Sequence, residues 1–296
     1  MRILLLGGNG QLGTALQDRL PALGEVVVAT RAECDLSQPS GVAAFVQSVK
    51  PDVIVNAAAY TAVDLAETEA EQAHAANGES AGELGGAAKD LNALLLHYST
   101  DYVFDGNGER PYLEDDPVSP ANAYGASKLA GEQAIRDSGC RHLILRTAWV
   151  YGPTGKNFFL TILRLAAERE ELGIVGDQTG CPTSTLWLAE ATASILSGPA
   201  SLDETLQATV HAVCAGQCSW FDFASAIVDG AKVRGETFAC RKIKPITTAD
   251  YPTPAARPAY SVLDTTRLRE MFGITPLSWR DALDEVLDRK FGPSPA

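Results

Sequence analysis

Short apolar runs alternate with longer amphipathic stretches over the first half of the chain. The apolar runs are continuous, which is typical of parallel strands that are buried on both faces of a sheet. They lie at residues 2–8, 25–30, 51–59, 92–100 and 142–152. Stretches with helical periodicity separate them, near residues 11–21, 39–49, 67–90 and 122–138. This alternation predicts an α/β fold of the Rossmann type, with a doubly wound parallel sheet.

The regular alternation ends near residue 152. Beyond it we expect helices near 157–170, 184–197 and 220–233, separated by the Gly- and Pro-rich stretches "GDQTGCPTST" and "YPTPAARP". We therefore expect residues 1–152 to form the sheet domain. Residues 153–296 are expected to form mainly a smaller, partly interleaved substrate-binding domain, with segments that return to the sheet domain.

Charge and hydropathy exclude two classes of partner. The formal net charge of -13 disfavours nucleic acid, because binding there depends on clustered Lys and Arg that neutralise phosphates. The apolar start of "MRILLLGGNG" is too short for a signal-peptide core, and no run approaches the length of a membrane span. We expect a cytoplasmic protein that binds neither nucleic acid nor a membrane.

The cysteines and histidines do not show a metal-binding pattern. Of six cysteines only Cys214 and Cys218 are close in sequence, and no second pair or histidine cluster accompanies them. Free buried thiols are the simpler interpretation, and we expect no metal site.

The glycines of "GGNGQLG" follow the first predicted strand and begin the first predicted helix. Gly7 would permit a tight turn, Gly10 would let the backbone approach a pyrophosphate, and Gly13 would let the helix pack on the strand. The helix N-terminus would offer N–H groups to the phosphates. Surface turns can imitate this spacing, but the strand–loop–helix context favours a dinucleotide site, so residues 1–152 would bind NADP(H).

The end of the second predicted strand favours NADPH over NADH. An acid there suits NAD, whereas a basic residue accommodates the 2′-phosphate of NADP, and this chain has Arg31. Arg31 could equally be a solvated loop residue, and NADH could also be used. Asp35 could bond the adenine amine or begin the next helix. Small side chains in "NAAAYT" (56–61) would leave room for a cofactor at the sheet edge.

Candidate catalytic groups follow the fourth predicted strand. Thr100 and Asp101 lie at its carboxyl end, and Tyr124 and Lys128 share one face of the next helix. A phenol loses its proton near pH 10, and a neighbouring ammonium lowers that value. Thr100 could orient a carbonyl that receives hydride. A Tyr-x-x-x-Lys pair occurs by chance on exposed helices. Its place after a nucleotide loop favours a tyrosine that donates a proton and a lysine that lowers the pKa of that tyrosine.

Seven stretches in order carry a family resemblance across nearly the whole chain. They are the glycine loop with "NAAAYTAVD", "YSTDYVFDG", "YGASKLAGE", "RTAWVYG", "DQTGCPTST" and "YPTPAARP". The chain resembles extended short-chain dehydrogenase/reductases, and among them the dTDP-4-dehydrorhamnose reductases. The resemblance implies an oxidoreductase that reduces the C4 ketone of dTDP-4-dehydro-L-rhamnose with NADPH or NADH. Its product would be dTDP-L-rhamnose, a nucleotide sugar for cell-surface polysaccharide biosynthesis.

The resemblance also implies roles for individual residues. Tyr124 would donate the proton, and Lys128 would be its partner and anchor the cofactor ribose. Thr100 and Asp101 would contact the sugar, with Trp149 packed beside it. Arg257 and the loop 177–184 would line the nucleotide-sugar cleft, although Trp149 and Arg257 could also be a core aromatic and a surface charge. The implied cofactor-binding residues are Gly7, Gly10, Gln11, Leu12, Gly13, Arg31, Asp35, Leu36, Ala59, Tyr60, Thr61, Tyr124 and Lys128.

Oligomeric state and competing activities complete these expectations. Some members of the family pair through Mg²⁺ held by glutamates, one of them on the first helix, where this chain has Ala15. We expect no metal bridge, and a monomer or weak homodimer. Sugar nucleotide dehydratases resemble this chain but carry Thr-Asp-Glu where it has Thr100-Asp101-Tyr102. A C4 epimerase with tightly held NAD and a non-catalytic regulatory homologue remain as alternatives.

Overall fold

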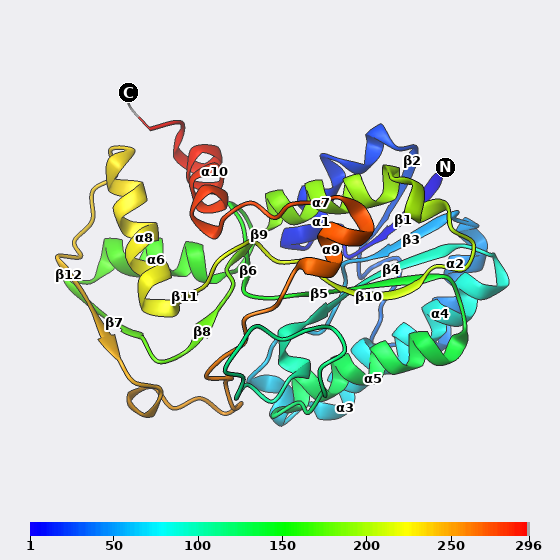
Figure 1. Cartoon of the computed structure of the whole chain (residues 1–296), viewed down its shortest axis with the longest axis horizontal. Coiled ribbons are helices and arrows are strands. Elements are labelled where there is room, and N and C mark those ends of the chain that lie inside the picture. Colours follow the sequence, from blue (N-terminus) through cyan, green and yellow to red (C-terminus); the bar gives the residue numbers. More distant parts are fainter. Residues whose placement is uncertain (295–296) are drawn as a thin grey trace.

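A computed structural model describes residues 1–294 of the chain. Its centre is a sheet of six parallel strands in the order β10-β5-β4-β3-β1-β2 (Figure 1). These strands are β1 (Arg2–Leu6), β2 (Glu25–Ala29), β3 (Val53–Asn56), β4 (Leu94–Thr100), β5 (His142–Thr147) and β10 (Gln207–His211). The predicted doubly wound Rossmann-type sheet is confirmed.

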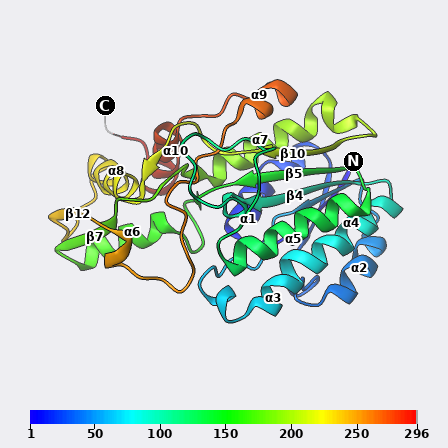
Figure 2. The ribbon, with the colours of Figure 1, turned by 60° about the horizontal axis from the view of Figure 1, so that its bottom comes forward.

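Helices cover both faces of this sheet, because its strands bury side chains on both sides. Ile3 and Leu5 of β1 belong to the core with α1 and α7, whereas Leu4 and Leu6 belong to the opposite core with α2 and α4. Figure 2 shows α2 to α5 layered on the second face. The helices are α1 (Gln11–Gln17), α2 (Val42–Val49), α3 (Ala70–His74), α4 (Ser80–Asp90), α5 (Ala123–Ser138) and α7 (Thr185–Ser197), with a π-helical turn η4 (Ala75–Glu79) between α3 and α4.

Beside the sheet lies a smaller lobe, on the left of Figure 1. It contains α6 (Phe158–Glu168) and α8 (Trp220–Val233), together with the strand pairs β7–β12 and β8–β11. A third short pair, β6–β9, connects it to the sheet, and α9 and α10 follow it in the chain. The bounds are β6 (Val150–Tyr151), β7 (Glu171–Val175), β8 (Thr179–Gly180), β9 (Thr183–Ser184), β11 (Cys218–Ser219), β12 (Lys242–Ile246), α9 (Thr266–Phe272) and α10 (Trp279–Phe291).

Short 3₁₀ turns connect several of these elements. They are η1 (Leu20–Ala22), η2 (Pro39–Gly41), η3 (Leu65–Glu67), η5 (Asp101–Val103), η6 (Pro199–Leu202) and η7 (Thr248–Asp250). Of these, η5 matters for the site, because it follows β4 directly and turns Asp101 and Tyr102 back over the strand end.

All five predicted strands form, but the structure differs from the sequence analysis in three places. The predicted helix 67–90 is divided by the π-helical turn at 75–79. The predicted strand 142–152 ends at Thr147, and Trp149 has a positive φ of 47°. The sixth strand, β10, was not predicted, because its five residues are only partly buried and show no continuous apolar run. The last two residues of the expected second domain lie outside the described residues.

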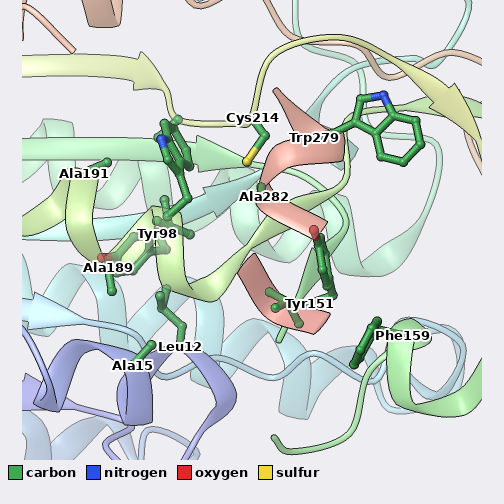
Figure 3. Close-up of a cluster of buried hydrophobic side chains, with 14 of the residues drawn as sticks. Leu12, Ala15, Tyr98, Tyr151, Phe159, Ala189, Ala191, Cys214, Trp279 and Ala282 are labelled. Atoms are coloured by element: carbon green, nitrogen blue, oxygen red, sulfur yellow. The ribbon is translucent and has the colours of Figure 1, made fainter. Parts of the chain in front are cut away.

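One hydrophobic core joins the sheet to the smaller lobe. Figure 3 shows Leu12 and Ala15 of α1 and Tyr98 of β4 in the same cluster as Trp279 and Ala282 of α10. The cluster also contains Phe159, Phe223 and Leu188 from α6, α8 and α7. The lobe is therefore packed against the α1 and α7 side of the sheet by buried apolar side chains.

Candidate active site

The glycine loop makes a tight turn after β1. Gly7 has φ +76°, and a Cβ there would lie 2.7 Å from the backbone nitrogen of Ala58. A Cβ on Gly13 would lie 2.1 Å from the carbonyl oxygen of Gly7. The turn and close packing predicted for these two glycines are thus confirmed. Gly10 is the N-cap of α1 and provides no side-chain cap, so the first N–H groups of the helix remain available to an anion.

The smaller lobe reaches this loop through residues 152–157. Gln11 donates to the Val150 carbonyl at 3.3 Å and accepts from the Asn157 amide at 3.2 Å. A Cβ on Gly155 would lie 3.1 Å from the Cβ of Gln11. Leu12 points into the core and is 8% exposed, so only its backbone is suited to contact a cofactor.

The end of β2 carries both a cation and an acid. Arg31 is exposed and forms an ion pair with Asp35 at 3.2 Å, so the two predicted adenosine-side residues are neighbours. Glu33, which the sequence analysis overlooked, accepts from the backbone N–H of Thr30 at 2.8 Å. The hydrogen bonds from Thr30 hold the pKa of Glu33 below its usual value, so this carboxylate already has hydrogen-bond partners within its own loop. Leu36 is buried in the core behind them.

Residues 59–61 follow β3 at the same edge of the sheet. Ala59 and Thr61 are exposed, and the backbone of Tyr60 is held by Asn77, whose side chain both accepts from its N–H and donates to its carbonyl. The same Asn77 amide donates to Ser127 on α5 at 2.9 Å. Asn77 lies on the π-helical turn, so this irregular turn connects the predicted cofactor edge to the helix of Tyr124.

Tyr124 lies in the first turn of α5, the helix on which the sequence analysis placed it, and faces Thr100 at the carboxyl end of β4. Its ring meets the ring of Tyr102 edge-on, with centroids 5.7 Å apart. Burial raises the pKa of Tyr124 above its ordinary value, and a hydrogen bond with the Thr100 hydroxyl acts in the opposite direction. The phenol is therefore protonated at neutral pH, which is the state that a proton donor requires.

Thr100 and Asp101 form a buried polar pair beneath Tyr124. The Thr100 hydroxyl donates to the Asp101 carboxylate at 3.0 Å and accepts from the Tyr102 N–H at 3.2 Å. Burial raises the pKa of Asp101 to about 6, although hydrogen bonds with Ser261 and Thr100 act against this. Asp101 thus carries a charge at neutral pH that its surroundings compensate only partly.

Lys128 lies one turn after Tyr124, and its side chain is directed to β4. Its Nζ donates to the Tyr98 carbonyl at 2.7 Å and lies 3.0 Å from Nε2 of His97. Burial lowers the pKa of Lys128 to about 8. Among the described residues, Nζ makes no hydrogen bond to the Tyr124 hydroxyl, so the expected tuning of Tyr124 by Lys128 stays a prediction.

Trp149 has a strained backbone conformation, and its ring lies between Trp220 and Gly180. Its ring stacks on Trp220 with centroids 3.5 Å apart and planes inclined by 7°. On the Gly180 side, an added Cβ would lie 2.5 Å from its Cε2 atom. Its φ of 47° is unusual for a bulky residue, and such strain often accompanies a functional site.

Arg257 approaches the same site from the Pro-rich loop 251–258. Its guanidinium donates to the Tyr102 hydroxyl at 3.1 Å and pairs with Asp64 at 2.8 Å. Since Tyr102 contacts Tyr124, the predicted Arg257 lies within one side chain of the predicted proton donor. It is not an isolated surface charge.

The family model of the RmlD substrate binding domain matches residues 1–291. The chain is 48% identical over 288 residues to dTDP-4-dehydrorhamnose reductase of Burkholderia thailandensis, covering 96% of this chain and 97% of the relative. It is 42% identical over 295 residues to that of Escherichia coli K12, covering 98% of both. The chain belongs to the RmlD family.

A solved structure supports the same relationship. The dTDP-4-dehydrorhamnose reductase of Bacillus anthracis, in complex with NADP, is 35% identical and superimposes with a TM-score of 0.89. The match covers 97% of this chain and 99% of that one. Membership of the RmlD family confirms the resemblance that the sequence motifs indicated.

Several site residues of this RmlD-family chain were not predicted. They are Tyr102, Asn77, His97, Asn122 and Glu67, which support Arg257, Tyr60, Lys128 and the start of α5. Glu67 accepts from the backbone N–H of Ala123, and Asn122 accepts from that of Gly125. Only Asn122 had a sequence signal, because Asn is a preferred N-cap immediately before a helix.

The described residues contain neither a metal-binding cluster nor a membrane-spanning helix. Within residues 1–294, no group of three or more His, Cys, Asp or Glu side chains is arranged to hold a metal ion. None of the helices in this range has the length and apolar character needed to cross a membrane. All six cysteines are buried and free, as the sequence analysis predicted.

Proposed function

We propose that this chain is an NADPH-dependent dTDP-4-dehydrorhamnose reductase. It reduces the C4 ketone of dTDP-4-dehydro-L-rhamnose to dTDP-L-rhamnose for cell-surface polysaccharide synthesis, with NADH as a poorer cofactor. The observation that carries the proposal is the half-buried Tyr124, whose pKa is raised above its ordinary value, beside the Thr100 hydroxyl at the carboxyl end of β4. Doubly wound sheets bind their ligands at this edge.

The chain's own residues bind the cofactor and orient the substrate. The cradle left by Gly7 and Gly13 has no room for a Cβ, and the open N–H groups after Gly10 suit a pyrophosphate. Gln11 and the backbone of Leu12 adjoin it, Arg31, Asp35 and Leu36 lie on the adenosine side, and Ala59, Tyr60 and Thr61 border the inner half. When bound, NADPH supplies the hydride.

Tyr124 supplies the proton to the substrate oxygen as negative charge develops there. Thr100 orients the carbonyl, and Lys128 anchors the ribose with the hydrogen-bonding capacity that His97 and Tyr98 leave free. Asp101 and Trp149 contact the sugar, and Arg257 binds the anionic part of the nucleotide, because its guanidinium already lies against Tyr102 at the mouth of the site.

One assay tests the reaction. Oxidation of NADPH is followed with dTDP-4-dehydro-L-rhamnose and, in parallel, with other nucleotide ketosugars. The proposal expects the highest kcat/KM for the dTDP-rhamnose precursor. Turnover of that substrate no better than of the other ketosugars would refute the substrate assignment, and no turnover of any would favour a non-catalytic homologue.

The site argues against the dehydratase alternative. Elimination of water needs an added acid and base, and the residue after Asp101 is a tyrosine that is occupied by Arg257. A C4 epimerase would retain NAD on purification, so a protein free of bound cofactor would exclude it.

The remaining proposals concern organisation. Residues 1–152 mainly bind NADP(H), and residues 153–296 mainly form the substrate side, with β10 returning to the sheet. Ala15 on α1 cannot ligate a metal, which supports a monomer or a weak homodimer without Mg²⁺; light scattering with Mg²⁺ and then with chelator tests this. Six free, buried cysteines support a cytoplasmic location.

A further inference from the structure

A buried chain of three polar side chains lies behind the active site. Asn56 at the end of β3, His97 in β4 and Lys128 in α5 are each at most 2% exposed. Asn56 Nδ2 lies 3.0 Å from His97 Nδ1, and His97 Nε2 lies 3.0 Å from Lys128 Nζ. Both ring nitrogens of the imidazole are therefore engaged by neighbouring side chains.

The backbone fixes the orientation of the Asn56 amide. Its Oδ1 accepts a hydrogen bond from the N–H of Ala58 at 3.1 Å. Because a backbone N–H can only donate, the other end of the amide, Nδ2, must face His97 as a donor. Nδ1 of His97 is consequently an acceptor, and the single proton of the neutral imidazole is on Nε2.

The imidazole is neutral. Burial is the largest cause that lowers the pKa of His97, and it lowers it well below the ordinary value. A neutral imidazole with its proton on Nε2 presents a donor to Lys128. An ammonium has three donors and no acceptor, whereas an uncharged amine has a lone pair that can accept this bond.

Other polar and charged groups lie around these three side chains. Glu132, one turn further along α5, favours the charged form of Lys128, but its carboxylate is already bound by Arg146 of β5 and by Arg136. His142 of β5 is bonded to the Cys140 carbonyl. Asp101 acts on Tyr124, and the turn η4 packs on α5 through the uncharged Asn77. None of these provides an acceptor that would replace the donor of His97.

We propose that His97 is a positioning residue for Lys128: its Nε2–H, fixed as a donor by Asn56, favours the uncharged amine of the lysine in the cofactor-free protein. In this state Nζ accepts from His97 and donates to the Tyr98 carbonyl, which leaves one N–H for a ligand. Charging Lys128 requires the proton of His97 to move to Nδ1 and the Asn56 amide to turn against Ala58. The inference rests on the proposed reductase function only for the identity of that ligand.

The first measurement is the tautomer of His97. Protein labelled with ¹⁵N-histidine is studied without cofactor, and the His97 signals are assigned by their loss in His97→Gln. The proposal expects the Nε2–H tautomer, and a Nδ1–H tautomer in the wild type would overturn it. Asn56→Asp, whose carboxylate accepts from Nδ1–H, is expected to reverse the tautomer.

The second measurement is the titration of Lys128. In protein labelled with ¹³C-lysine, its signal is assigned by its loss in Lys128→Met. We expect its pKa below the ordinary lysine value and an upward shift of about one unit or more in His97→Gln, because a glutamine amide can turn its oxygen to the ammonium. His142→Gln is the matched control and should leave the titration in place. An unchanged titration in His97→Gln would overturn the proposal.

Kinetics provide a separate check. If the reductase function holds, His97→Gln should move the basic limb of the pH profile of kcat/KM upward in parallel with the Lys128 titration. Both NMR measurements are made without substrate or cofactor, so their results do not depend on whether the protein reduces the ketone. Failure of the His97 proposal and failure of the reductase function can therefore be distinguished.

Discussion

The Asn122 side chain donates a hydrogen bond to the backbone carbonyl of Ala256 at 2.9 Å while it caps helix α5 through the N–H of Gly125 at 2.8 Å. One amide therefore joins the start of the helix that carries Tyr124 and Lys128 to the Pro-rich loop that carries Arg257. The proposed proton donor and the proposed substrate-side loop are therefore positioned by the same side chain.

This double role can be separated by mutation. Asn122→Ala should lose both bonds and lower the free energy of unfolding by about 1 kcal/mol, the usual value of an N-cap. Asn122→Ser keeps a good cap but is too short to reach Ala256, so it should retain most of the stability and raise KM for the nucleotide sugar. Chemical denaturation and steady-state kinetics measure the two effects. Equal KM values for Asn122→Ser and the wild type would show that the tether does not position the loop.

Removal of the Tyr124 hydroxyl tests its role as the proton donor. Tyr124→Phe should lower kcat by about 10²–10⁴-fold, the usual contribution of general acid catalysis, with little change in NADPH affinity. Thr100→Val should cost less, since Thr100 orients the carbonyl without giving the proton. The role is falsified if Tyr124→Phe keeps wild-type turnover while hydride transfer limits the rate. Asp101 or a bound water would then have to be reconsidered.

Arg31 is expected to set the cofactor preference. Its guanidinium is exposed and, within residues 1–294, is paired only with its neighbours Asp35 and Ser37, so it can turn to a 2′-phosphate. Arg31→Ala should lower the ratio of kcat/KM for NADPH to that for NADH by roughly tenfold, the value of one charged hydrogen bond. Arg19→Ala, which removes an exposed arginine paired with Glu190 at 3.0 Å, is the control. A ratio that does not change in Arg31→Ala would contradict this role.

Asp101 makes stability depend on pH with a definite sign. Its pKa is raised to about 6 in the folded state, so the folded protein binds more protons than the unfolded chain between that value and the ordinary one near 4. Stability is therefore lost as pH rises through this window. Asp101→Asn removes the effect, and its stability relative to the wild type should increase by about 2 kcal/mol between pH 4.5 and 7.5. Urea unfolding at the two pH values measures it, and a constant difference would contradict the burial of an uncompensated charge.

Much of this fold and site could be predicted from the sequence, for local reasons. Continuous apolar runs mark parallel strands that are buried on both faces. The glycine spacing predicts the turn after β1, where Gly7 adopts a φ of +76° that residues with a side chain rarely adopt. The partner of Lys128 could not be predicted in this way. His97 is an ordinary residue of an apolar strand, and it reaches Lys128 only because of the way α5 packs on β4. Glu33 was overlooked for a similar reason, since its bond to Thr30 depends on the loop conformation.

Strand β10 has a consequence for protein engineering. It is the edge strand of the sheet, beside β5, yet residues 207–211 lie between two parts of the smaller lobe in the chain, with α6, β7 and β8 before them and β11, α8 and β12 after them. The lobe is therefore built from two stretches of the chain, separated by part of the sheet domain, and is not an appended module. A chimaera with a single junction near residue 152 would take this edge strand and helix α7 from a different parent than the rest of the sheet. Exchange of substrate specificity between relatives by recombination thus needs two exchanged segments, one on either side of the stretch that contains α7 and β10.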